Sequence, residues 1–262
     1  MPVLIQGGAG VGAGAEVIVW GGLPDLSAAY KGKGKVDHFD VKARITAYSR
    51  SLITNDTFIK IIDVQPGAYL TNYIDLGFGY APRPVPESKE EYEVRLTFDP
   101  ETPLPIVDMV EDYGKYVVGS LKWALEGDES RWEEVQTVHA APEYITPRQM
   151  IEVFTQGKSR NSSLEPRANP ESISLAALSV SGRNVTYTQI PEQDFYESKE
   201  RIFGPLGAIA LVKMHRGIRE VGFFGGSELE PSNRHLAGKA RTFAQAFEAY
   251  PASIKAVIGA AS

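Results

Sequence analysis

Two short runs decide the fold of this chain: EVIVWGG at residues 16–22 and FIKIIDVQPG at residues 58–67. Each is a stretch of apolar, β-forming residues that stops at glycine or at proline–glycine, which predicts strands over 16–20 and 58–65. Between them, residues 37–52 have the spacing of an amphipathic helix. Its expected apolar stripe is Ile45, Tyr48 and Leu52. Strand, helix and strand in this order indicate a βαβ unit and therefore a parallel sheet.

A loop is expected between the first strand and the helix, running to Lys35. Further elements follow along the chain after the second strand. Strands are predicted at 92–98, 135–140 and 185–190, and helices near 108–125, 205–221 and 239–249. Thr146 and Gln149 flank Pro147 in the pattern of a capping box, so a helix should begin there. In the helix at 108–125 the apolar positions are Val110, Val117, Leu121 and Leu125, and the acidic residues at its start are Asp108, Glu111 and Asp112. These acids favour the positive end of the helix dipole rather than an acid/base pair.

The composition excludes several classes of function. The 262 residues carry a formal charge of −6 and contain no cysteine, so disulfides, thiolate catalysis and zinc–thiolate sites are ruled out. The four histidines lack metal-ligand spacing, and we expect no metal. No basic cluster suits nucleic acid, and no run is long enough to span a bilayer. The expected location is the cytoplasm, with the nucleus as a second location.

A glycine-rich segment lies near the amino terminus. Gly8, Gly10 and Ala13 match the pattern G-x-G-x-x-G/A of dinucleotide-binding loops after an apparent strand. That motif needs a helix behind it to bind a pyrophosphate. Only three residues separate Ala13 from the strand that starts at Val17, so the segment is expected to be a lead-in and not a phosphate site.

The ordered blocks of this sequence resemble the NmrA-like family, an atypical branch of the short-chain dehydrogenase/reductases. The resemblance spans about residues 16–250. Its most specific parts are His38-Phe39-Asp40-x-Lys42 at a helix start and Pro66-Gly67-x-Tyr69-x-x-Asn72 after the next strand. Weaker matches follow in the right order at TPLPIVDMVEDYGKYVVGSL, AAPEYITPRQMIEVF, VSGRNVTYTQIP and GIREVGFFGG.

The resemblance implies an α/β fold: part of a Rossmann-like parallel sheet (its second half) with a smaller α+β domain. The expected NAD(P)-binding domain covers 1–80 and 106–142, and the substrate or partner domain covers 81–105 and 143–262. Two departures stand out. The first half of the family's sheet, with its glycine fingerprint, is expected to be missing. Residues 157–179 interrupt the family spacing and are expected to be an irregular insertion or unspliced sequence.

The resemblance also implies site residues. In the superfamily, a lysine matching Lys42 holds the nicotinamide ribose, and its usual tyrosine partner four residues earlier is replaced here by His38. Both face one side of a helix, so His38 could relay a proton or could be merely a polar helix-start residue. The predicted cofactor residues after the second strand are Pro66, Gly67, Tyr69, Leu70, Thr71 and Asn72. Aromatic residues expected to line a substrate pocket or to fill the core are Tyr73, Phe78, Tyr80, Phe223 and Phe224.

Three functions remain open at this stage. The leading prediction is an NADP- or NAD-dependent oxidoreductase acting on a small organic molecule. The second is a non-catalytic regulator that binds a partner protein and senses NAD(P), which the missing tyrosine favours. The third is an inactive truncated product.

Overall fold

The computed structural model describes residues 3–6, 17–53, 60–74, 78–86, 88, 91–156 and 184–249. The chain forms two compact units, each assembled from segments that lie far apart in the sequence. Unit 1 comprises Met1–Gly67, Met109–Pro142 and Arg216–Ala240, and unit 2 comprises Ala68–Asp108, Glu143–His215 and Arg241–Ser262. The glycine motif at 8–13 and the expected insertion at 157–179 lie outside the described residues.

Unit 1 is organised around a sheet of four parallel strands in the order β1-β2-β3-β8. The strands are β1 (Val3–Gln6), β2 (Val17–Trp20), β3 (Lys60–Pro66) and β8 (Thr137–Ala140). The register pairs Trp20 with Asp63 and Pro66 with Ala140, so the carboxyl ends of the strands meet at one edge. The parallel βαβ arrangement predicted from the sequence is confirmed.

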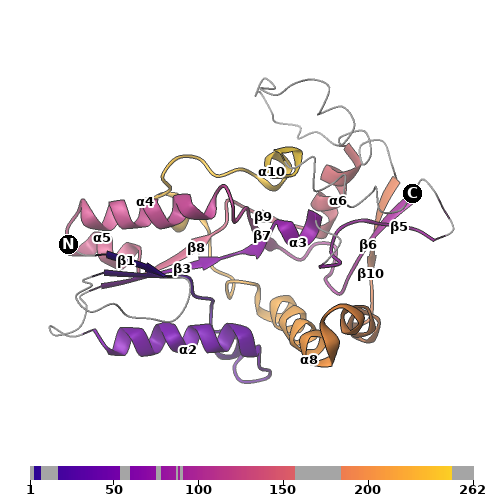
Figure 1. The fold of residues 1–262 in the computed structure, drawn as a ribbon, viewed down its shortest axis with the longest axis horizontal. Helices are drawn as coiled ribbons and strands as arrows, with labels where there is room; N and C mark the ends of the chain where they lie inside the picture. Colours follow the sequence, from indigo (N-terminus) through magenta and orange to yellow (C-terminus); the bar gives the residue numbers. More distant parts are fainter. Residues whose placement is uncertain are drawn as a thin grey trace. The chain divides into compact units, whose positions relative to one another are not determined.

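Helices cover both faces of this sheet. The described helices that lie wholly in unit 1 are α1 (Leu26–Ala29), α2 (Asp37–Ser51), α4 (Tyr113–Leu125), α5 (Glu129–Glu134) and α9 (Glu230–Asn233). Figure 1 shows α2 on one side of β3 and α4 on the other. Burial on both faces explains why β2 is a continuous apolar run and why β3 is buried from Ile61 to Pro66, including the polar residues Asp63 and Gln65.

Unit 2 contains two three-stranded sheets. One joins β4 (Ala68–Tyr69), β7 (Leu104–Val107) and β9 (Tyr144–Ile145), and the other joins β5 (Arg83–Pro84), β6 (Glu91–Leu96) and β10 (Asn184–Gln189). β6 and β10 run parallel over six residue pairs. Among the described residues, the helices that lie wholly in this unit are α3 (Thr71–Ile74), α6 (Pro147–Gln156) and α10 (Phe243–Ala249). Each of the two sheets contains one parallel and one antiparallel strand pair, as expected for the α+β part of the fold.

The helix α8 (Glu192–Val221) has a break in its middle. Gly204 adopts φ 70°, ψ 175°, a conformation that glycine reaches without the penalty of a side chain. Pro205 follows and has no N–H to donate, so the helical ladder is interrupted at this point. The sequence predicted only the second half of this element, from residue 205 onward.

The capping box at α6 is confirmed. The Thr146 N–H donates to Gln149 Oε1 at 2.8 Å, and the Gln149 N–H donates to Thr146 Oγ1 at 3.3 Å. Two orphan donors at the helix start are thus satisfied by side chains, as the sequence pattern predicted.

Several sequence expectations about helices were wrong. In α2, Ile45 is 40% exposed and Tyr48 is 65% exposed, whereas Phe39 and Thr46 are the buried residues. The helix expected at 108–125 begins only at Tyr113, and Val110 is 72% exposed. In α2 the spacing of apolar residues predicted the wrong buried face, because Phe39 and Thr46 are the side chains that pack inward.

The expected loop and domain boundaries also differ from the structure. The stretch before Lys35 contains the short helix α1, whose start is capped by the Asp25 carboxylate accepting from the Ala28 N–H. Arg216–Ala240, expected in the smaller domain, belongs to unit 1. Among the described residues, no helix has the length and hydropathy needed to cross a membrane.

Candidate functional site

A buried carboxylate organises the carboxyl edge of the sheet in unit 1. Asp63, on β3, is 1% exposed and accepts hydrogen bonds from the Gly22 N–H at 3.0 Å, Thr46 Oγ1 at 3.2 Å and Gln65 Nε2 at 2.8 Å. Burial raises the pKa of Asp63, and these donors oppose the rise. Asp63 thereby ties β2, β3 and α2 together at one point. A Cβ on Gly22 would lie 2.1 Å from Asp63 Oδ1, so only glycine permits this approach.

Lys42 lies beside this carboxylate. Its Nζ donates to the Gly21 carbonyl, just beyond the end of β2, at 2.9 Å, and lies 5.9 Å from the centre of the Trp20 ring. Burial lowers the pKa of Lys42, and the charge of Asp63 opposes that effect. The predicted site lysine is therefore held at the edge where parallel sheets bind ligands.

Lys42 retains hydrogen-bonding capacity. An ammonium has three N–H donors, and among the described residues the Lys42 ammonium makes one hydrogen bond. At the same edge, Gln65 Oε1 is buried without a hydrogen-bond partner in the part of the chain that the structure describes. Buried polar atoms are rarely left unpaired, so this edge is suited to a ligand that brings hydroxyl groups.

His38 lies one helical turn before Lys42, in the first turn of α2. Its ring packs edge-on against Phe39 with centroids 5.0 Å apart. Partial desolvation lowers the pKa of His38, although its side chain remains open to solvent. The neutral imidazole is therefore the dominant form at neutral pH, and it could accept or pass on a proton.

Asp40 fixes the loop that leads into this helix. Its carboxylate accepts from the Ser27 N–H and Oγ and from the Val36 N–H, at 3.2, 2.5 and 3.0 Å. These bonds hold α1 and the start of α2 together. The sequence marked Asp40 only as part of a resemblance block, whereas the structure gives it a positioning role.

Tyr113 was missed by the sequence reasoning. It is the first residue of α4, and its hydroxyl donates to the Val64 carbonyl at 2.8 Å. A Cβ on Gly21 would lie 3.2 Å from this hydroxyl. The phenol therefore lies at the edge that carries Lys42. Its only signal in the sequence is a tyrosine at a helix start after a strand.

The loop after β3 divides between the two units. Pro66 ends β3 and Gly67 donates its N–H to the Ala140 carbonyl at 3.1 Å, which places both at the carboxyl edge of unit 1. The remaining predicted cofactor residues belong to unit 2: Tyr69 on β4, Leu70, and Thr71 and Asn72 on α3. Leu70 is buried and donates its N–H to the Val107 carbonyl. Its side chain is thus a core residue.

Most of the aromatic residues considered for a pocket are core residues. Tyr73, Tyr80, Phe223 and Phe224 are each no more than 5% exposed. Phe223 packs edge-on against Phe39 within unit 1, with centroids 5.2 Å apart. In unit 2, the Tyr80 hydroxyl meets His215 Nε2 at 2.6 Å, and Thr97 Oγ1 meets His215 Nδ1 at 2.9 Å. The structure therefore favours the alternative in which these four aromatic residues fill the core and do not line a substrate pocket.

Unit 2 has a second polar cluster that the sequence did not indicate. Lys199, on α8, is 2% exposed, and its Nζ donates to the carbonyls of Phe78 and Gly79 at 3.0 and 2.9 Å. Burial, aided by the charge of Arg83, lowers the pKa of Lys199 to about 7. Lys199 borders a cavity of about 530 Å³. Both carbonyl bonds favour the charged form, which indicates a structural role for this amine.

Comparison with known proteins now adds to the geometry. The model of the NmrA-like family matches residues 8–250. The chain belongs to the NmrA-like family. This result confirms the resemblance drawn from the two sequence blocks around Lys42 and Gly67. A comparison with curated proteins found no match.

Solved structures of NmrA-like and related proteins share the fold. NmrA, a negative transcriptional regulator in complex with NADP, is 18% identical with a TM-score of 0.57, over 92% of this chain and 66% of that one. An NADPH-dependent quinone oxidoreductase from Escherichia coli, complexed with NADPH, is 15% identical with a TM-score of 0.53, over 93% and 74%. A nucleoside-diphosphate-sugar epimerase from Staphylococcus aureus is 9% identical with a TM-score of 0.56, over 95% and 76%.

These likenesses establish the NmrA-like fold. The chain spans about two thirds of the length of NmrA. Its architecture is α/β, with a Rossmann-like parallel sheet, as the sequence predicted. A regulator and an oxidoreductase share this fold, so the fold alone does not distinguish a catalytic from a regulatory role.

Proposed function

We propose that this chain is an NAD(P)-dependent oxidoreductase of the NmrA-like family that acts on a small organic molecule. The observation that carries the proposal is the Lys42 ammonium, held by the Gly21 carbonyl at the carboxyl edge of β2. Ligands of parallel α/β sheets bind outside this edge. The related structures that hold NADP and NADPH give the ligand class.

The residues at this edge fit the ribose and nicotinamide half of such a cofactor. Lys42 would donate to ribose hydroxyls, and the unpaired Gln65 Oε1 would accept from a hydroxyl or an ordered water. Asp63 keeps Gly21 and Gly22 in place through the Gly22 N–H. When bound, a reduced nicotinamide supplies a hydride, and the protein contributes orientation and a proton.

Two side chains are candidates for handling the proton. His38 lies one turn from Lys42 on the same helix and remains open to solvent. Tyr113 presents its hydroxyl at the carboxyl edge, next to Gly21. Pro66, the last residue of β3, and Gly67 after it would flank the nicotinamide from within unit 1, as the family resemblance implies.

A second candidate function is a non-catalytic regulator that binds NAD(P) and a partner protein. The observation in its favour is that His38 stands where the superfamily has a tyrosine, because an exposed imidazole is a poor replacement for a lysine-assisted phenol. Both functions require the nucleotide; the enzyme would also turn over a substrate, and the regulator would also bind a partner protein.

A fluorescence titration with NADPH and NADH tests the proposal. Wild-type protein should enhance nicotinamide fluorescence with saturation. Lys42→Met should weaken nucleotide binding by about tenfold or more, because it removes a charge-assisted hydrogen bond and keeps a long, unbranched side chain. Lys35→Met is the matched control, because Lys35 is an exposed cation before the same helix.

The outcomes separate the candidates. Binding that Lys42→Met weakens and Lys35→Met leaves unchanged supports a site at this edge. Equal affinities for all three proteins, or no binding of either nucleotide, would remove the basis for both functions. Oxidation of NADPH by quinones, enones or aldehydes would then favour the enzyme, and binding without turnover would favour the regulator.

A further inference from the structure

A separate cavity lies at the opposite edge of the sheet in unit 1. It is lined by Arg50, Ile53, Lys60, Ile61, Trp132 and Gln136. Lys60 is the first residue of β3, and Gln136 immediately precedes β8, so the cavity borders the amino ends of these parallel strands. Lys42 and Gly21 belong to the carboxyl ends. The cavity is therefore distinct from the proposed nucleotide site.

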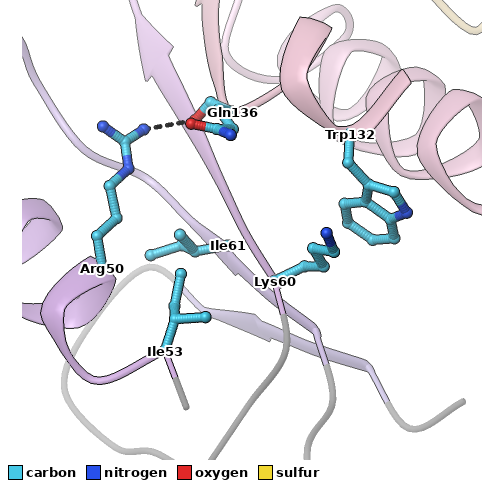
Figure 2. Close-up of a pocket in the computed structure, with 6 residues that line it drawn as sticks. All are labelled: Arg50, Ile53, Lys60, Ile61, Trp132 and Gln136. Carbon is cyan, nitrogen blue, oxygen red and sulfur yellow. Dashed lines mark hydrogen bonds between the residues drawn. The ribbon is translucent and has the colours of Figure 1, made fainter. Parts of the chain in front are cut away.

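Its side chains combine positive charge with flat apolar surface (Figure 2). Figure 2 shows Arg50 on one side and Trp132 with Lys60 on the other, with Ile61 and Ile53 between them. The Lys60 Nζ lies 5.7 Å from the centre of the Trp132 ring. The described lining residues include two cations, Arg50 and Lys60, although the chain as a whole carries a formal charge of −6.

Arg50 is held in a fixed position. Its Nη2 donates to the Gln136 carbonyl at 2.7 Å and to Thr137 Oγ1 at 3.0 Å. Its Nε is buried and has no hydrogen-bond partner among the described residues. Both of these acceptors are neutral, and the charge of Arg50 also acts to lower the pKa of the buried Asp63 carboxyl. Carboxylates are the groups that a guanidinium binds best.

The size of the cavity limits the ligand. Its volume is about 260 Å³, slightly below the roughly 300–1,000 Å³ of typical ligand pockets. A whole dinucleotide is too large for this space, whereas a one- or two-ring molecule fits. The largely buried Trp132 indole and the two isoleucines supply the apolar part of the lining.

We propose that this cavity binds a small aromatic carboxylate. The carboxylate would lie between Arg50 and Lys60, and the ring would pack against Trp132 and Ile61. The recognition is the sum of charge pairing and apolar burial, so both parts of the ligand are needed. The site does not depend on the proposed oxidoreductase activity.

Calorimetric titration of the full chain with 2-naphthoate and with neutral 2-naphthamide tests this site. The carboxylate should bind with a Kd on the order of 1 mM or tighter, as expected for a ligand of this size. The amide should bind about tenfold more weakly because it lacks the charge. Lys60→Met and Arg50→Gln should each weaken naphthoate binding by about tenfold.

Two further variants make the test specific. Arg44→Gln is the matched control, because Arg44 is an exposed cation on α2 that does not line the cavity. Trp132→Phe retains an aromatic core residue and should weaken both ligands together. Saturating NADPH should leave naphthoate affinity unchanged, because the two sites lie at opposite ends of the strands.

The proposal is overturned if naphthoate fails to bind, or if the amide binds equally well. It is also overturned if Lys60→Met and Arg50→Gln bind like wild type, or if Arg44→Gln weakens binding as much as they do. A failure of NADPH binding with naphthoate binding intact would contradict the proposed function alone.

Discussion

At the residue scale, Asp63 is the group on which the edge geometry depends. It is nearly fully buried, and it joins Gly22, Thr46 and Gln65 through side-chain and backbone bonds. Because Lys42 donates to the neighbouring Gly21, any shift in Asp63 would move the proposed ligand-binding lysine. Asp63 is therefore a positioning residue for Lys42.

The pH dependence of stability follows from the raised pKa of Asp63. Burial makes the folded state hold this proton more tightly than the unfolded chain does. Its stabilising contribution is therefore complete below the unfolded pKa of about 3.9 and is lost as the pH rises through the higher folded pKa. We expect the free energy of unfolding of Asp63→Asn to fall less than that of wild type as the pH rises from about 4 to about 8.

Urea titration at each pH measures this difference. In Asp63→Asn, the amide oxygen can still accept from the Gly22 N–H. The new amide N–H can donate to Gln65 Oε1 once the Gln65 side-chain amide flips. Asp63→Ala is the comparison variant: it leaves the Gly22 N–H without its acceptor and should cost about 1–3 kcal/mol. Parallel pH profiles for wild type and Asp63→Asn would contradict the account.

Only part of this residue-level geometry could be predicted from the sequence. Lys42 was found because a family pattern marks it, and the structure places it at the sheet edge. Asp63 is one of three polar residues in the run FIKIIDVQ, with Lys60 and Gln65, and Tyr113 is one of twelve tyrosines in the chain. Their roles depend on contacts 41 and 49 residues away along the chain, which local patterns do not contain.

At the element scale, the packing of α4 depends on a glycine inside the helix. A Cβ on Gly119 would lie 1.9 Å from the His235 carbonyl oxygen and 2.5 Å from the Ala237 nitrogen. The Ala237 N–H also donates to the Lys115 carbonyl, so this segment lies directly on the helix. Helix propensity alone would favour alanine at this position, and tertiary contact overrides it.

Gly114 supplies the matched comparison in the same helix, because a Cβ there meets nothing within 4 Å. Gly119→Ala should lower the free energy of unfolding by about 1–3 kcal/mol through overpacking. Gly114→Ala should raise it by about 0.5–1 kcal/mol. Urea titration of both variants measures the contrast. If both changed stability in the same direction, the close approach of the 235–237 segment would be wrong.

The capping box of α6 carries its own prediction. Thr146→Ala removes the hydroxyl that accepts from the Gln149 N–H, and it should cost about 1 kcal/mol in chemical denaturation. Gln149→Ala removes the reciprocal bond to the Thr146 N–H. The double variant should cost less than the sum of the two, because the pair acts as one motif. Full additivity would indicate that the two bonds form independently.

Five strands and the capping box of α6 were predicted because their signals are local. The runs that became β2, β3, β6, β8 and β10 are short, apolar or alternating, and end at recognisable breakers. The buried faces of α2 and α4 were predicted only in part: Val117 is buried as expected, whereas Tyr48 and Leu125 are exposed and Thr46 and Gly119 are buried. Here the buried polar bonds and a close backbone approach, rather than hydrophobic period, select the inner face.

At the scale of the whole molecule, unit 1 offers two edges with different chemistry. The carboxyl edge holds Lys42 and Asp63, and the amino edge holds Arg50, Lys60 and Trp132. Parallel strands force this separation, because every strand ends at the same edge. The sequence did not predict that residues 216–240 belong to unit 1. No local pattern indicates that the chain passes back from unit 2 to unit 1 at this point.

The measurement that tests the central claim most directly is hydrogen–deuterium exchange with and without saturating NADPH. The account predicts slower exchange in peptides covering 17–22, 36–46 and 63–67, at the carboxyl edge, and unchanged exchange at 129–136. Saturation with NADPH that protects only the amino edge, or that leaves the peptides around Gly21 and Lys42 unchanged, would contradict it.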